Sequence, residues 1–397
     1  MTLSDPRVFL VAGEPSGDTL GAGLLRALRV QAPGMQARGI GGPGMVSAGM
    51  ELVFPYDDLA IMGVFEVLPK LGRLRQRWRE AEAAILAFRP DVVVTIDSSG
   101  FNKGLAKRLI KAKSPARRVH YVAPMVWAWR PGRAKGMARL FQRLLTLFPF
   151  EPSYFTPYGL PSDAVGHPAV EAAPGDGAAF RSRHNIPESA PTLALLPGSR
   201  RGEVRRMLPL LGDAVQRLAP SLPGLHLICP TVPLVAPALR AALAQWALPA
   251  TVVESPDEKP HAFAAADAAL AASGTITLEL ALARVPMVVA YRVNPMTAYL
   301  GAHLLKVPSA ALPNLLAERA LVPEFLQQYA TPKRLAAETL ALFRDPAVRQ
   351  SQLRGFAEIA EKLRPGEISP SATAANIVLE EAVRGRAASE SKAHKDE

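Results

Sequence analysis

The segment DAALAASGTITLELALARVPMVVAYR, residues Asp267–Arg292, decides the fold. It predicts a buried strand, a turn of small residues at Ser273-Gly274-Thr275, a helix and a second buried strand. The first N–H groups of a helix have no partner inside it, and the helix dipole favours an anion there. With Glu279 about one helical turn further on, the segment indicates a nucleotide site, where amides hold the diphosphate and the carboxylate holds ribose hydroxyls. The alternative is a packing turn followed by a solvated glutamate.

Length and charge limit the protein class. A chain of 397 residues predicts two domains, and 49% apolar residues are enough for sizeable cores. Lys and Arg outnumber Asp and Glu by 46 to 35, a net charge of +11, which favours anionic partners: nucleic acid, phosphorylated small molecules or an acidic membrane surface. The positive charge does not form one basic stripe interleaved with aromatic side chains, so we expect no nucleic acid.

The sequence offers little to hold a metal. The single cysteine, Cys229, lies in the apolar run GLHLICP and is predicted to be a buried structural thiol. No Cys/His cluster has zinc-ligand spacing, and no D-x-D motif is present, so we expect neither metal nor cofactor. The N-terminus leads directly into an apolar strand, and no apolar run is long enough to span a bilayer. We therefore expect a cytosolic protein, or one attached to a membrane from the cytosolic side.

Strand and helix patterns alternate in both halves of the chain. The predicted strands include RVFLVAGE (7–14), DVVVTID (91–97), RRVHYVAP (117–124), TLALLPGSR (192–200), GLHLICP (224–230) and ATVVES (250–255). This alternation predicts an α/β protein of two tandem Rossmann-like domains, with the active site in the inter-domain cleft at the carboxyl ends of the strands. The expected parts are residues 1–168, residues 169–350, helices over 351–383 that pack back across the cleft, and a polar, disordered tail over 384–397.

The loop GEPSGD, residues 13–18, follows the first strand and opens a helix. Its small residues allow the backbone to approach a ligand closely, which makes Glu14, Ser16 and Gly17 candidates for ligand contact. A tight turn in which Ser16 caps the helix is the alternative interpretation.

The loop LLPGSRRGEV, residues 195–204, follows the first strand of the second half. Gly198 and Ser199 allow a tight turn, and Arg200 stands beside the helix start. A guanidinium there can neutralise a diphosphate and stabilise it as a leaving group. Alternatively, Arg200 and Arg201 only solvate a loop.

The loop TIDSSGFN, residues 95–102, places Asp97 at the end of a continuous apolar strand. A carboxylate at the carboxyl edge of a parallel sheet can act as a general base. Asp97 could instead cap the following helix, a role that Ser98 or Ser99 would fill equally well. His120 is the competing base, although a strand histidine is more often a core residue.

The stretch IMGVFEVLPKLGRLRQRWRE, residues 61–80, has apolar side chains at helical spacing with arginines between them. An ordinary helix with its apolar face in the core is one interpretation. The other is an interfacial helix whose apolar side chains meet acyl chains or the membrane while its arginines meet lipid phosphates. The candidate contacts are Phe65, Val67, Leu68, Leu71, Leu74 and Trp78.

The order of these motifs resembles the lipid A disaccharide synthase family. The motifs that carry the resemblance, from about Val8 to about Val322, are GEPSGDTLGAGL, MGVFEVL, ID followed by FN, HYVAPMVWAWR, LLPGSRRGEV, ASGTITLE, PMVVAYR and LPNLLA. The resemblance implies an inverting GT-B glycosyltransferase that needs no metal. It implies transfer of 2,3-diacylglucosamine from UDP-2,3-diacylglucosamine to 2,3-diacylglucosamine 1-phosphate, giving a β(1→6) disaccharide 1-phosphate and UDP. It also implies attachment to the anionic cytoplasmic face of the Gram-negative inner membrane, and no particular oligomeric state.

The resemblance also implies roles for matched residues. Asp97 becomes the base for the acceptor 6-hydroxyl, and Arg200 faces the diphosphate. The SGT turn lies near phosphate with Glu279 near the ribose, Glu14 and Ser16 lie on the opposite cleft wall, and Asn314 of LPNLLA is a weaker cleft candidate.

One position departs from the family pattern. Many members carry a second acid before the phenylalanine of IDxPDFN, where this chain has Gly100. We take this departure to mean that Asp97 is the important acid. The rival enzyme class is another GT-B protein acting on UDP-GlcNAc, either a transferase with a soluble acceptor or an epimerase.

Overall fold

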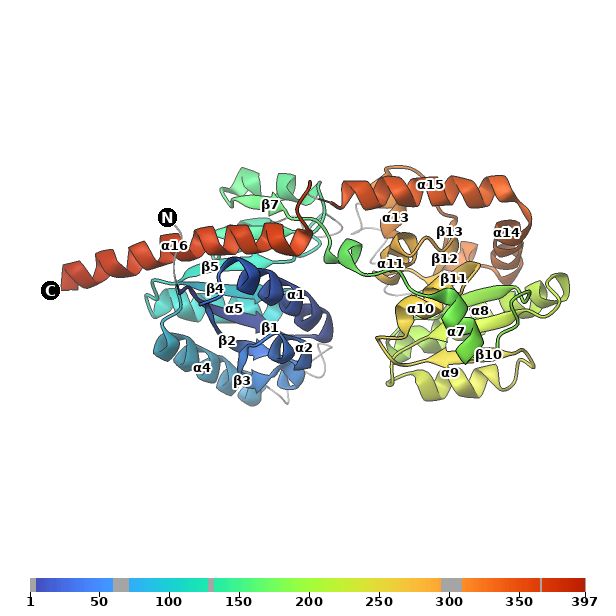
Figure 1. Cartoon of the computed structure of the whole chain (residues 1–397), viewed down its shortest axis with the longest axis horizontal. Coiled ribbons are helices and arrows are strands. Elements are labelled where there is room, and N and C mark those ends of the chain that lie inside the picture. The colour runs from blue at the N-terminus through green and yellow to red at the C-terminus, as the bar shows by residue number, and fades with distance from the viewer. Residues whose placement is uncertain (1–4, 60–70, 128–131, 294–308, 365, 397) are drawn as a thin grey trace. The chain divides into compact units, whose positions relative to one another are not determined.

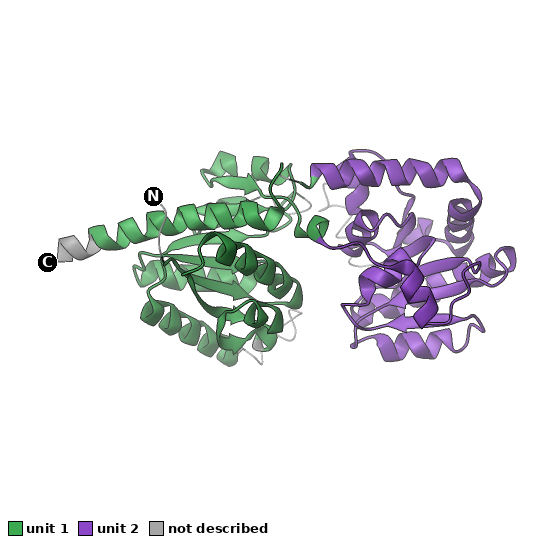
Figure 2. Cartoon of the chain, in the orientation of Figure 1, with its two compact units in different colours: residues 1–171, 363–397 green, residues 172–362 purple. Residues whose placement is uncertain are grey.

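The computed structural model describes residues 5–59, 71–127, 132–293, 309–364 and 366–396, and it consists of two compact units (Figures 1 and 2). The first unit comprises residues 1–171 and 363–397, and the second comprises residues 172–362. Each unit contains one parallel sheet with helices packed on it. The predicted fold class, two Rossmann-like α/β domains, is therefore confirmed.

The sheet of the first unit has seven parallel strands in the order β3-β2-β1-β4-β5-β6-β7. The strands are β1 (Arg7–Ala12), β2 (Gln36–Gly41), β3 (Glu51–Pro55), β4 (Val92–Ile96), β5 (Arg117–Tyr121), β6 (Arg143–Thr146) and β7 (Ser162–Ala164). Strand β4 is buried along its whole length because it lies between neighbours in a sheet covered on both faces. Strands β3, β6 and β7 were not predicted, since each is short and mixes polar with apolar residues.

The helices of the first unit follow the strands on both faces of the sheet. They are α1 (Pro15–Gln31), α2 (Pro43–Ser47), α4 (Leu71–Phe88), α5 (Ser99–Lys111), α6 (Arg133–Ala138) and α16 (Pro370–Asp396), with short 3-10 turns over 56–58, 151–154, 156–158 and 168–171. Helix α1 begins at Pro15 with Glu14 in the N-cap position, so the predicted Ser16 cap is wrong. Proline suits the first helical position because its fixed φ is helical and its missing N–H would have had no partner.

The sheet of the second unit has six parallel strands in the order β10-β9-β8-β11-β12-β13. They are β8 (Thr192–Leu196), β9 (His226–Pro230), β10 (Ala250–Val253), β11 (Ala268–Ala272), β12 (Met287–Tyr291) and β13 (Glu324–Leu326). The helices are α7 (Gly177–Arg183), α8 (Arg201–Leu218), α9 (Ala236–Leu243), α10 (Lys259–Ala264), α11 (Ile276–Leu282), α13 (Leu312–Ala317), α14 (Pro332–Arg344) and α15 (Pro346–Lys362), with 3-10 turns over 219–221 and 327–329.

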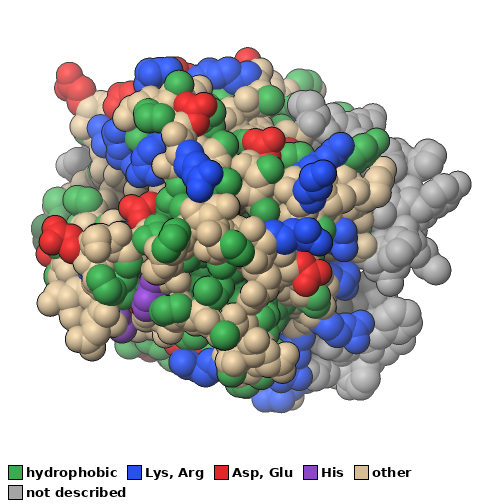
Figure 3. Space-filling view, turned by 90° about the vertical axis from the view of Figure 1, so that its right-hand side faces the viewer, with side chains coloured by type: hydrophobic (Ala, Val, Ile, Leu, Met, Phe, Trp, Pro, Cys, Tyr) green, Lys and Arg blue, Asp and Glu red, His purple; other side chains and the backbone are tan. Residues whose placement is uncertain are grey.

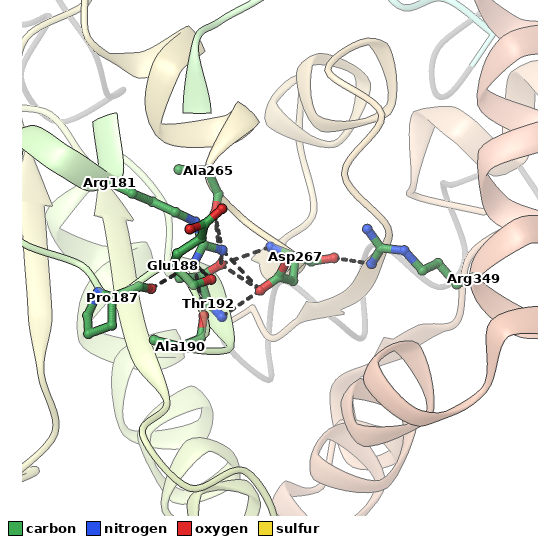
Figure 4. A network of polar contacts seen from close by, with 8 residues as sticks. All are labelled: Arg181, Pro187, Glu188, Ala190, Thr192, Ala265, Asp267 and Arg349. Carbon is green, nitrogen blue, oxygen red and sulfur yellow. Dashed lines mark hydrogen bonds and ion pairs between the residues drawn. The ribbon is translucent and has the colours of Figure 1, made fainter. Parts of the chain in front are cut away.

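A polar network fixes the amino ends of β8 and β11 (Figure 4). The carboxylate of Asp267 accepts hydrogen bonds of 2.8 Å from the backbone N–H and the hydroxyl of Thr192, and it pairs with Arg181 at 3.2 Å. Arg349 donates to the carbonyl oxygen of Asp267. These contacts tie together the starts of the two strands whose carboxyl ends carry the PGSR and SGT turns.

The end of the chain is helical where a disordered tail was predicted over 384–397. Helix α16 continues to Asp396 and belongs to the first unit. The guanidinium of Arg386 bonds both carboxylate oxygens of Asp91 at 2.7 and 3.1 Å, and Arg117 pairs with the buried Glu381 at 2.6 Å. The polar composition of the segment concealed this order, because its partners are charged groups of the sheet rather than apolar side chains.

Candidate active site

The candidate base Asp97 lies in a left-handed turn at the carboxyl end of β4. Asp97 and Ser98 have φ angles of 46° and 37°, a region that residues with a side chain rarely adopt. The backbone N–H of Asp97 donates to the carbonyl oxygen of Tyr121 at 2.9 Å. The side-chain amide of Asn102, which is completely buried, donates to the carbonyl oxygens of Ile96 at 3.2 Å and Asp97 at 2.8 Å. The backbone of Tyr121 and the side-chain amide of Asn102 therefore hold the turn in place.

The environment of Asp97 favours the protonated carboxyl. The side chain is half-buried, and burial raises its pKa, while the backbone N–H of Ser98 acts in the opposite direction. A carboxylate whose pKa is raised is a stronger base toward a substrate hydroxyl. Ser98, not Asp97, occupies the N-cap position of α5, so the capping alternative for Asp97 is wrong.

The competing base His120 belongs to the core. Its side chain is completely buried, Nδ1 lies 2.7 Å from the hydroxyl oxygen of Thr95, and the ring stacks on Phe141 at 4.8 Å between centroids. Burial, and secondly the charge of Lys103, lower the pKa of His120 to about 3. The imidazole is therefore neutral at neutral pH and is enclosed by core side chains.

The first loop lies directly against the Asp97 turn. Strands β1 and β4 are paired neighbours, with Ala12 opposite Ile96. A Cβ atom added to Gly13 would lie 2.3 Å from the hydroxyl oxygen of Ser98, so only glycine allows this approach. Glu14 is half-buried and Ser16 is exposed just beyond it, and Gly17 is buried. The structure thus brings GEPSGD and Asp97 together at one edge of the sheet.

Asp18 is a residue of this edge that sequence reasoning missed. Its carboxylate is buried and accepts hydrogen bonds from the backbone N–H groups of Gly42 at 2.8 Å, Gly44 at 2.8 Å and Met45 at 3.0 Å. It fixes the loop between β2 and α2 against α1. The glycine-rich run GGPG at 41–44 was the available indication of this contact, because the backbone N–H groups of glycines are accessible to a carboxylate.

In the second unit, the PGSR turn follows β8. Gly198 has a φ of 115°, and a Cβ there would lie 2.3 Å from Oε2 of Glu203. The same Oε2 accepts a hydrogen bond from the backbone N–H of Ser199 at 3.1 Å. Arg200 occupies the N-cap position of α8, is exposed, and forms no ion pair within the described ranges. Its guanidinium is available to an anion.

Three further side chains surround this turn and were not predicted. Burial and the carboxylate of Glu203 raise the pKa of Tyr291, while the charges of Arg200 and Arg206 oppose the rise. Tyr291 ends β12, two strands from β8 in the sheet order. Glu203 and Arg206 belong to α8 and Tyr291 to β12, so the contacts that reveal them as neighbours join two separate parts of the sequence.

The SGT turn lies at the same edge of the second sheet, because β11 pairs with β8 on one side and with β12 on the other. The hydroxyl of Ser273 donates to the carbonyl oxygen of Ala310 at 2.8 Å, and that of Thr277 donates to Gly274 at 2.8 Å. Glu279, on α11, pairs with Lys259 of α10. The predicted ribose contact of Glu279 stays a prediction, and it would have to compete with this ion pair.

Asn314 has a structural role in this unit. It is buried, its amide donates to the carbonyl oxygen of Val322 at 3.1 Å, and its oxygen accepts from the N–H groups of Leu321 and Val322 at 2.8 Å. These bonds hold the end of α13 to the following loop. A contact between Asn314 and a ligand stays a prediction.

The amphipathic stretch is only partly described. Phe65, Val67 and Leu68 lie outside the described residues, and Leu71 begins α4. Leu74 and Trp78 pack against the core of the first unit; the indole N–H of Trp78 donates to the carbonyl oxygen of Phe101 at 3.0 Å, and the two rings stack at 5.9 Å. Leu74 and Trp78 therefore follow the first interpretation, an ordinary helix with its apolar face in the core, because both pack against the buried cluster that contains Phe101.

Other features concern metal, thiol and membrane. Within the described ranges, no group of three or more His, Cys, Asp or Glu side chains could hold a metal ion. Cys229 is completely buried, and burial raises the pKa of its thiol to about 12.

In the described part of the chain, no helix has the length and apolarity needed to cross a bilayer. On the face drawn in Figure 3, Lys and Arg side chains lie in separate groups with acidic and apolar side chains between them.

Comparison with known proteins decides the family. The sequence model of the family described as lipid-A-disaccharide synthetase matches residues 8–378. The chain belongs to this family. The lipid-A-disaccharide synthase of Rhodospirillum centenum is 47% identical over 94% of both chains, and that of Gluconobacter oxydans is 44% identical over 94% of this chain and 90% of the relative. The protein is therefore a glycosyltransferase, and the family does not favour an epimerase or a transferase with a soluble acceptor.

Solved structures agree with the fold. MurG of Acinetobacter baumannii aligns over 94% of this chain and 99% of its own, with a TM-score of 0.56 and 15% identity. A UDP-N-acetylglucosamine 2-epimerase from Listeria monocytogenes aligns over 94% and 95%, with a TM-score of 0.63 and 12% identity. At such identities the likeness concerns the GT-B fold alone, which transferases and epimerases share.

Proposed function

We propose that this member of the lipid-A-disaccharide synthase family transfers 2,3-diacylglucosamine from UDP-2,3-diacylglucosamine to 2,3-diacylglucosamine 1-phosphate. The products are the β(1→6) disaccharide 1-phosphate and UDP. Family membership over residues 8–378 supports the UDP-sugar donor and the lipid acceptor.

Asp97 is the proposed base. Its carboxylate takes the proton of the acceptor 6-hydroxyl while that oxygen attacks C1 of the donor sugar from the side opposite to UDP, so the configuration inverts. The single observation that carries this assignment is the half-buried carboxyl with a raised pKa, presented in a left-handed turn at the sheet edge.

The second unit is proposed to bind and stabilise the leaving group, UDP. Arg200 is exposed without an ion pair among the described side chains, and the PGSR and SGT turns follow paired strands at one sheet edge. A guanidinium and helix-start N–H groups stabilise the charge that develops on UDP as the glycosidic bond breaks. Ser199, Gly198, Ser273, Gly274, Thr275 and Glu279 complete the proposed donor site.

Attachment to the cytoplasmic face of the inner membrane is proposed for the first unit. The support is a set of exposed arginines on α4, namely Arg73, Arg75 and Arg79, which follow the mostly apolar sequence VFEVL of residues 64–68. Cationic side chains beside apolar ones suit a surface of anionic lipids.

Incubation with the UDP donor and the monosaccharide 1-phosphate, followed by mass spectrometry, tests the function directly. We expect disaccharide 1-phosphate from the wild type, and a rate about 10²–10⁴ times lower from Asp97→Asn, as for loss of a general base. Asp213→Asn, the same change at an exposed position of α8, should keep the full rate. Absence of disaccharide from the folded wild type would refute the function, and a near-normal rate for folded Asp97→Asn would refute the base alone.

A further inference from the structure

The excess positive charge of this protein is concentrated in one part of the first unit. Residues 98–150 contain twelve Lys and Arg residues and no Asp or Glu. The whole chain has 46 Lys and Arg residues and 35 Asp and Glu residues, so the chain outside this segment is close to neutral. These residues include α5, β5, α6 and β6. Their charge must be balanced by groups from elsewhere in the chain or by a ligand.

Part of this charge is balanced within the protein. Arg108 pairs with Glu82 at 2.5 Å, Arg117 with Glu381 at 2.6 Å and Arg143 with Asp163 at 2.5 Å. Each carboxylate comes from outside residues 98–150. Lys103 and Lys107 on α5 are different, because no described side chain forms an ion pair with either of them.

Lys103, Lys107 and Arg133 form a cationic cluster where α5 meets α6. The two lysines are one helical turn apart on either side of Ala106, and Ala106 packs in one buried cluster with Ala134 and Met137 of α6. Arg133, the first residue of α6, precedes Ala134. Burial, then the charges of Arg133 and Lys107, lower the pKa of Lys103, which is half-buried. Like charges held together in this way are stabilised by an anion.

The cluster lies at the same edge of the sheet as the proposed base. Lys103 directly follows Asn102, whose amide bonds the carbonyl oxygen of Asp97. The charge of Lys103 also acts on His120, which is paired with Thr95 two residues before Asp97. Lys103 thus belongs to the first part of the helix that the Asp97 turn opens at the carboxyl end of β4.

We propose that Lys103, supported by Lys107 and Arg133, binds the phosphate monoester of the acceptor sugar. This inference rests on the proposed function. The acceptor carries the attacking hydroxyl and the phosphate on one hexose ring, so an ammonium that holds the phosphate also orients the hydroxyl toward Asp97. An anionic lipid headgroup offers the same chemistry, but the half-buried Lys103 beside the base suits a bound substrate, whereas the exposed arginines of α4 suit a membrane surface.

The test compares Lys103→Met with Lys103→Arg and with Lys111→Met, which makes the same charge change at an exposed position of the same helix. Initial rates are measured with the acceptor 1-phosphate and with its analogue that lacks the phosphate. With the phosphorylated acceptor, we expect Lys103→Met to raise the acceptor KM about tenfold or more, the effect of one lost charge-assisted hydrogen bond. The donor KM stays unchanged, Lys103→Arg recovers most of the loss, and Lys111→Met behaves as wild type.

The analogue separates the outcomes. Wild type and Lys103→Met should have equal kcat/KM on the acceptor without phosphate, because the contact is absent in both. An equal loss on both acceptors, with an unchanged melting temperature, would overturn the proposal. So would weaker flotation of Lys103→Met, compared with Lys111→Met, on vesicles of anionic phospholipid, since that outcome assigns Lys103 to the membrane. If wild type makes no disaccharide from either acceptor, the proposed function itself fails.

Discussion

The side-chain amide of Asn102 donates a 2.8 Å hydrogen bond to the carbonyl oxygen of Asp97, five residues earlier in the chain. A second bond from the same nitrogen reaches Ile96 at 3.2 Å. Two consecutive residues with side chains, Asp97 and Ser98, are left-handed at this point. Each such residue costs on the order of 1 kcal/mol or more, so the turn needs contacts that exclude its alternatives. Asn102 supplies two of them.

Replacing this amide should disturb the base without touching it. Asn102→Ala leaves two carbonyl oxygens without their donor, and we expect a loss of about 1–3 kcal/mol in unfolding free energy, measured by urea denaturation. We also expect kcat to fall about tenfold or more, because small displacements of a catalytic group are costly. A variant that loses stability but retains kcat would show that the amide has only a structural role.

The rate should rise with pH on the acid side. Asp97 accepts a proton only as the carboxylate, so kcat/KM increases as pH passes through its raised pKa and then levels. The stability of the fold changes with pH in the opposite direction. Because the pKa of Asp97 is higher in the folded than in the unfolded chain, the free energy of unfolding falls as pH rises between these two pKa values. Asp97→Asn removes the cost of burying this carboxylate, so the variant should match or exceed the stability of the wild type at pH 8. An acid limb positioned at the ordinary Asp pKa would contradict the burial argument.

Arg200 and its neighbour Arg201 form a matched pair, since both are exposed arginines at the start of α8. Arg200→Gln should lower kcat/KM about a hundredfold, because it removes a charge that stabilises departing UDP. Arg201→Gln should change kcat/KM less than about twofold, since it alters only the screened electrostatic potential around the site. Steady-state rates with varied donor measure both, and equal losses would point to long-range electrostatics.

Two glycines near the PGSR turn give opposite expectations for one substitution. Gly198→Ala places a methyl group 2.3 Å from Oε2 of Glu203 at a φ of 115°. We expect it to cost about 1–3 kcal/mol and to raise the donor KM. Gly202→Ala, in the first turn of α8 with its nearest neighbour at 3.6 Å, should be neutral or stabilise by up to about 1 kcal/mol. Thermal unfolding of both variants decides whether backbone conformation or added volume matters.

Several parts of the protein could be predicted from local pattern. The runs VVVTI and AALAA are continuous apolar strands, so their carboxyl ends, and therefore Asp97 and the SGT turn, were correctly located. The order of the motifs led to the family that comparison confirms. Strands β3, β6, β7 and β13 escaped prediction because each is short and mixes polar with apolar residues, so that no continuous apolar run marks it.

What the sequence alone determined is the fold class, the family and the chemical character of the candidate residues, since alternation, apolar runs and small-residue turns act over a few neighbouring positions. Only the tertiary structure decided which candidates are free to react. It enclosed His120 among core side chains, placed Trp78 against Phe101, and ordered residues 384–396 through the pairing of Arg386 with Asp91. It also braced Asp97 with Asn102, and it left Lys103 and Lys107 of α5 without an ion pair to any described side chain. Burial and charge pairing depend on partners distant in sequence, and no local pattern specifies them.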